Sequence, residues 1–146
     1  MTIKTFRGLI DTDEQQTITL HTNTGSTGYR IVNIAIMPHN PGTVANIEGV
    51  IKVYKVSQTT ETSEVDFSDQ TLLAAGYIQE SISEIYGLSH HVVFEKEIFN
   101  QDIYITYKAT EGTEKLNYYL ELEQVKLDLS ENTVATLKDI RNITSQ

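Results

Sequence analysis

The sequence contains no cysteine and no tryptophan among its 146 residues. The absence of cysteine excludes disulfide bonds, thiolate metal ligands and thiol nucleophiles together. A chain of this length still buries roughly 70% of the surface that its unfolded form would expose, so it can build a core without such cross-links. We therefore expect one domain that spans residues 1–146.

Basic residues are scarce. The chain has 11 Lys and Arg against 20 Asp and Glu, which gives a net charge of −9. No run of cations interrupts this acidic excess, and binding to nucleic acid depends on clustered cations that release counterions from phosphates. The composition predicts that nucleic acid is not a partner and that the surface resists nonspecific association.

Long apolar runs are also missing. Uninterrupted apolar runs reach four residues, as in IAIM at 34–37, whereas a membrane-spanning helix needs about 20. Residues 1–16 contain no apolar stretch of the kind found in a secretion signal. We expect no membrane contact and a protein that stays in the cytosol or is assembled from there.

The sequence does contain repeated alternation of apolar and polar residues with β-branched and aromatic members, which is typical of strands. This pattern occurs at 17–22, 29–37, 90–99, 102–109 and 115–129. The segment 47–56 is apolar on both faces, as a central strand would be, and the polar segment 57–64 predicts a loop. With about eight strands and little helix, the pattern predicts an all-β fold, an antiparallel two-sheet β-sandwich of jelly-roll type.

Two of these strands are separated only by Asn100 and Gln101. The alternating segments 90–99 and 102–109 flank this short connection. Such spacing predicts that the two segments pair as a hairpin.

The strand at 115–129 changes phase along its length. Its apolar residues occupy even positions from Leu116 to Leu122, and odd positions at Val125, Leu127 and Leu129. A β-bulge within the strand would produce such a slip. We predict that the even set lines the core and that the odd set lies at its margin, under a helix or a neighbouring subunit.

A short C-terminal helix is predicted at 131–141. Val134, Leu137 and Ile140 recur at intervals of three, and Ser130 can cap the first turn. This helix is the favoured cover for the odd-phase residues, because exposed apolar patches of that size are unusual on monomers.

Histidine provides no metal site by its spacing. His90 and His91 are adjacent, so on a strand they point to opposite faces and cannot ligate the same ion. Metal-binding jelly rolls of the cupin type use two histidines separated by one residue, and this pattern is absent. The sequence predicts no metal and no cofactor.

Two glutamate pairs have a spacing that overlaps the one used in glycoside hydrolysis. Glu95 and Glu97 share one strand face, as do Glu121 and Glu123. Both pairs lie on polar faces beside lysines, whereas a catalytic acid needs an apolar pocket that raises its pKa. We therefore predict no catalytic residue and no enzyme.

Five phrases carry a resemblance to a known family: FRGLI at 6–10, GYRI at 28–31, FSDQTLLAAGYIQ at 67–79, IFNQDIYIT at 98–106 and NYYLELEQVKLDLSENTVATLKDIRN at 117–142. In these phrases the chain resembles small virion structural proteins of marine tailed bacteriophages, including cyanophages, over most of residues 3–142. The resemblance implies a protein of the particle, most simply a head decoration or cement protein in the virion, assembled in the host cytoplasm.

On this hypothesis the partners are the major capsid protein or other virion proteins, and the chain forms a homo-oligomer. Contact would use apolar or aromatic residues outside the core, since aromatic residues are enriched at interfaces. The candidate interface residues are Tyr119, Val125, Leu127 and Leu129.

Other functions remain open at this level. The chain could be a tail, neck or fibre-associated structural protein of the virion, which the sequence does not separate from a head protein. It could also be a carbohydrate-binding β-sandwich, for which eight tyrosines count in favour and the lack of tryptophan counts against.

Overall fold

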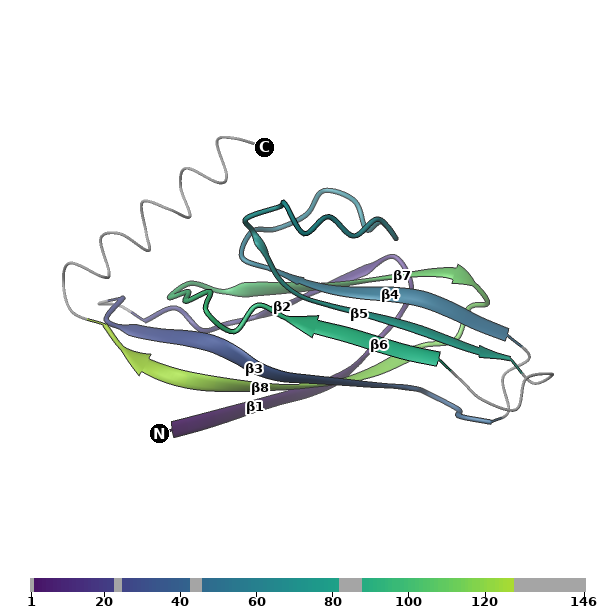
Figure 1. The fold of residues 1–146 in the computed structure, drawn as a ribbon, viewed down its shortest axis with the longest axis horizontal. Helices are drawn as coiled ribbons and strands as arrows, with labels where there is room; N and C mark the ends of the chain where they lie inside the picture. Colours follow the sequence, from purple (N-terminus) through teal and green to yellow (C-terminus); the bar gives the residue numbers. More distant parts are fainter. Residues whose placement is uncertain (1, 23–24, 43–45, 82–87, 128–146) are drawn as a thin grey trace.

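The protein is described here by a computed structural model that covers residues 2–22, 25–42, 46–81 and 88–127 (Figure 1). Within these ranges the chain forms strands and no helix. The strands are β1 (Thr2–Ile10), β2 (Glu14–Ile18), β3 (Thr27–Pro38), β4 (Asn46–Tyr54), β5 (Leu72–Ser81), β6 (Leu88–Val93), β7 (Ile103–Glu111) and β8 (Leu116–Lys126). The helix predicted at 131–141 and the residue Leu129 lie outside the described residues.

The strands form two antiparallel sheets, which confirms the all-β, two-sheet prediction. The small sheet has three strands in the order β1-β8-β3, and the large sheet has five in the order β2-β7-β4-β5-β6. Figure 1 shows the small sheet below the large one. Inward-facing side chains of both sheets form one hydrophobic core, in which Ile34 and Leu120 face Ile51 and Ile105 from the opposite layer.

The central strand and the loop that the sequence predicts are both confirmed. β4 lies between β5 and β7 in the large sheet, and its side chains are buried on both faces. Residues 57–64 contain no strand and belong to the connection between β4 and β5. Figure 1 shows this connection over the outer side of the large sheet.

Lys52 explains how a polar loop is held over an apolar strand. Its side chain points outward from β4 and is buried beneath the connection, where Nζ donates to Thr62 Oγ1 at 3.0 Å and to the carbonyl of Glu64 at 2.5 Å. Burial lowers the pKa of the Lys52 ammonium. This anchor fixes the position of the residues that follow, including Val65 and Phe67.

The even-phase prediction for β8 is confirmed, but the predicted bulge in that strand is wrong. Leu116, Tyr118, Leu120 and Leu122 are all buried, and β8 pairs with β1 in unbroken register. The register shift lies in the neighbouring β3, at the bulged residue Val32. In β8 the buried even positions end at Leu122; residues 123–125 are partly buried, Lys126 is exposed, and Leu127 just beyond the strand is buried.

The hairpin predicted between 90–99 and 102–109 is also wrong. β6 pairs with β5 at one edge of the large sheet, whereas β7 pairs with β2 and β4. The connection does not turn tightly, because Phe99 crosses to the small sheet. There its backbone exchanges hydrogen bonds of 2.8 and 2.9 Å with Tyr29.

Candidate functional site

The outer face of the small sheet carries a hollow of about 560 Å³, which we call the outer hollow. Three neighbouring strands bring its outward side chains together. Tyr119 of the central strand β8 is paired with Arg7 of β1 on one side and with Ala35 of β3 on the other, and Asn117 of β8 is paired with Met37 of β3. Met37 is 57% exposed. The outer hollow therefore presents a thioether, an aromatic ring, an amide and a guanidinium to the surroundings.

Polar contacts orient the aromatic ring at this hollow. The Tyr119 hydroxyl donates to Glu121 Oε1 at 3.0 Å. This hydrogen bond to a carboxylate raises the pKa of the Tyr119 hydroxyl. Tyr119 therefore stays neutral at physiological pH and can offer its ring to a partner.

The three predicted interface residues that the structure describes, Tyr119, Val125 and Leu127, do not form one patch. Tyr119 and Val125 both face outward from β8, but six positions of a strand separate them by about 20 Å, and Glu121 and Glu123 lie between. Val125 pairs with Gly28 and is half-buried. Leu127 is 5% exposed and lies against Gly28, whose added Cβ would be 3.0 Å from Leu127 Cγ.

A second apolar surface lies at the opposite sheet, and we call it the β6 groove. It has a volume of about 120 Å³ and lies between the β4–β5 connection and strands β5 and β6. Val65, Phe67 and Val92 line it and are exposed. Phe67 contacts Phe94 edge to face, with ring centroids 5.4 Å apart.

The two adjacent histidines lie on β6, opposite different partners. His90 is opposite Tyr77 and His91 is opposite Gly76, and both are exposed. Tyr77 is held by a hydrogen bond of 2.6 Å from its hydroxyl to Glu48 Oε1, which raises the pKa of that hydroxyl. Because neighbouring residues of a strand point to opposite faces, these two side chains cannot ligate the same ion.

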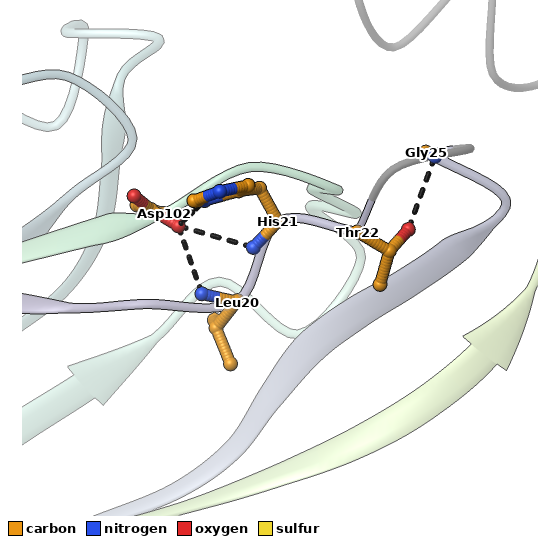
Figure 2. A network of polar contacts seen from close by, with 5 residues as sticks. All are labelled: Leu20, His21, Thr22, Gly25 and Asp102. Carbon is orange, nitrogen blue, oxygen red and sulfur yellow. Dashed lines mark hydrogen bonds and ion pairs between the residues drawn. The ribbon is translucent and has the colours of Figure 1, made fainter.

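Another histidine takes part in a polar network that the sequence does not reveal. The Oδ1 atom of Asp102 accepts hydrogen bonds from the backbone N–H groups of Leu20 and His21, at 2.8 and 3.0 Å, and lies 2.7 Å from His21 Nδ1 (Figure 2). Partial burial of Asp102 acts to raise its pKa, but these hydrogen bonds outweigh burial and lower it. The network ties the end of β2 to the start of β7.

Three of the four glutamates of the two pairs are engaged in structural contacts, and the fourth, Glu95, is exposed. Glu123 forms an ion pair with Arg30 across the small sheet, and Glu121 accepts from Tyr119. Glu97 forms an ion pair of 3.0 Å with the buried Lys55. Neither arrangement places two carboxylates in the apolar pocket that acid catalysis requires.

Within the described ranges, no group of three or more His, Asp or Glu side chains is placed to hold a metal ion. The same part of the chain contains no helix long and apolar enough to cross a membrane.

Sequence reasoning missed the two most exposed large apolar side chains of the described residues. Met37 and Phe67 are each 57% exposed, and neither is among the interface residues that the sequence predicts. Phe67 did have a usable signal, since it lies between Asp66 and Ser68 in a segment of turn-forming residues. Met37 had one as well, because it alternates with Ile34 and Ile36, so a period of two places it on the outer face of the strand.

Comparison with known proteins gives no match to a protein-family model, to a curated protein or to a solved structure.

Proposed function

We propose that this chain is a structural protein of a phage virion, a decoration or cement protein that binds the assembled head shell. The observation that supports it is the outer hollow, where Arg7, Met37 and Tyr119 are accessible together. Tyr, Met and Arg are the residue types enriched where proteins bind one another. The sequence resemblance to virion proteins supplies the class of partner.

A jelly-roll winding of the two sheets is part of this proposal. The first strand pairs with the eighth, the second with the seventh and the fourth with the fifth. The third lies against both the fifth and the sixth across the gap between the sheets. A long two-stranded ribbon that rolls up gives this nested order, and jelly rolls are common in viral particles. β6 departs from it by pairing with β5.

The chemistry of the outer hollow suggests what it would bind. An apolar side chain of the shell would enter beside Met37 and the Tyr119 ring, and an acidic or carbonyl group would meet Arg7. Such a contact excludes water at its centre, and each decoration protein would add interface area that helps the shell resist internal pressure. The acidic remainder of the surface would limit nonspecific contacts.

The test is co-sedimentation of the purified chain with phage heads that lack it. Met37→Asp places a charge in the outer hollow, and we expect its affinity to fall at least about tenfold. Ile98→Asp is the matched control, because Ile98 is exposed outside the outer hollow and should keep full binding. Circular dichroism would check that both variants fold. Equal loss in both variants, or no binding by the wild type, would refute the proposal.

A carbohydrate-binding function is the second candidate. The Tyr119 ring lies beside Asn117 and Arg7, and the hollow's volume falls within the range of small-ligand sites. A glycan array would show binding that Tyr119→Ala abolishes. Such binding would indicate that the chain recognises a glycan surface.

A tail, neck or fibre location is a further alternative, and it would appear as a low copy number of the chain per particle.

A further inference from the structure

β6 is an edge strand without the usual protection against pairing. Its sequence, LSHHVV, contains no Asp, Glu, Lys, Arg or Pro, and its register with β5 has no bulge. Natural edge strands are normally blunted by charges, prolines or bulges, because their free backbone groups can pair with another chain. All but one of its six residues are exposed.

The other edge strands of the described chain do carry such protection. β1 has Lys4 and Arg7, and β2 has Glu14. β3 has Arg30 and a bulge at Val32, and Tyr29 near its start is bridged to Phe99. β6 is thus the edge on which a pairing partner meets the least resistance.

The apolar β6 groove runs alongside this edge. Exposed Val65 and Phe67 approach it from the connection, and exposed Leu88 and Val92 belong to β6 itself. None of the described residues that line the groove is Asp, Glu, Lys or Arg. In a chain of net charge −9, two copies repel one another over most of their surface. A charge-free edge is therefore a favourable place for two copies to meet.

We propose that β6 pairs antiparallel with β6 of a second copy of this chain and joins the two large sheets into one continuous sheet. Such a contact is isologous, with its twofold axis perpendicular to the sheet. Residues that face one another across the two strands then lie on the same side of the joined sheet. The twofold axis therefore passes beside a residue of β6 that faces the same residue of the second copy, and only a few registers of the two strands satisfy this condition.

The register centred on His90 matches the side chains best. It places Leu88 opposite Val92 of the second copy on the outer face, and His90 opposite its own counterpart. Cross-strand contact between two exposed aliphatic side chains is a favourable pairing in antiparallel sheets. The two Phe67 rings then flank the junction, one from each copy. This contact uses neither Tyr119 nor the outer hollow.

The first test is the oligomeric state of the full chain by sedimentation equilibrium. We expect a wild-type dimer, and Val92→Lys should raise its dissociation constant at least about tenfold. Ile3→Lys is the matched control, because Ile3 is a similarly exposed apolar residue on the edge strand β1 and should leave the dimer intact. A monomeric wild type, or a dimer that Val92→Lys does not weaken, would overturn the proposal.

The absence of native cysteine allows a second test of the register. Under oxidising conditions His90→Cys should form a disulfide between copies, since facing residues of paired strands approach the Cβ separation of a disulfide. Ser89→Cys should not, because in this register Ser89 faces His91 of the second copy, so the two copies of residue 89 would be offset by two positions along the strand and too far apart for a disulfide. Equal cross-linking of both variants would overturn the register. Met37→Asp should leave the dimer unchanged, so failure of shell binding and failure of dimerisation are distinguishable.

Discussion

Gly49 of β4 lies directly against the ring of Tyr107 of β7, on the core side of the large sheet. A Cβ atom added at Gly49 would be 2.7 Å from Tyr107 Cε1 and 2.9 Å from its hydroxyl oxygen. The ring is fully buried and its hydroxyl donates to the carbonyl of Glu114 at 3.3 Å. Glycine at this position is therefore required by a close approach between neighbouring strands.

We predict that Gly49→Ala lowers the free energy of unfolding by about 1–3 kcal/mol, the usual cost of overpacking a core. The measurement is chemical denaturation. Gly76→Ala is the matched control on β5, because its Cβ would meet single methyl groups, Ile51 Cγ2 at 3.0 Å and Ile36 Cδ1 at 3.3 Å, and would lie 3.8 Å from the His90 carbonyl oxygen, an ordinary van der Waals distance. The control should lose clearly less stability. Equal losses would show that the Tyr107 ring is not the cause.

A second prediction concerns acid stability. The pKa of Asp102 is lowered in the folded chain, so its ionised form contributes stability above the ordinary carboxyl pKa. That contribution is lost as the pH falls through the lowered pKa. Asp102→Asn should therefore be less stable than the wild type by about 1 kcal/mol near neutrality. The difference should shrink between about pH 5 and about pH 2.

Thermal or denaturant unfolding across this pH range is the measurement. Asp13→Asn is the control, because Asp13 forms an exposed ion pair of 2.6 Å with Lys108, and such pairs contribute about 0–1 kcal/mol. Asparagine also tolerates the left-handed backbone at this position, where φ is 62°. A pH-independent difference between the wild type and Asp102→Asn would contradict the prediction.

The fold class could be predicted because alternation reports burial on a strand directly. The even positions of β8 and the two-faced burial of β4 followed from this pattern alone. The bulge could not be located, because Ile31 and Val32 are both apolar and either could face the core. Only pairing with β8 decides that Ile31 points inward.

Long-range contacts explain the remaining errors. The hairpin prediction failed because Phe99 pairs with Tyr29, and a contact between residues 70 positions apart leaves no local signal. A lysine in a strand normally predicts an exposed face, yet Lys52 is buried under a loop that it anchors. The β6 groove could not be predicted either, because it forms only where the β4–β5 connection lies beside β6.

Of the candidate interface residues that the structure describes, one lines the outer hollow. This is Tyr119, whereas Val125 lies far along β8 and Leu127 is buried just beyond the end of that strand. Met37 and Arg7 reach Tyr119 only because the small sheet places three strands in register. A single sequence does not contain that register.

The measurement that tests the central claim most directly is the copy number of this chain in purified phage particles, by quantitative peptide mass spectrometry. A decoration or cement protein should be present in numbers on the order of hundreds per particle, because only a symmetric shell lattice offers so many equivalent sites. A few to a few dozen copies would instead indicate a tail or neck component. Absence from the particles would contradict the account.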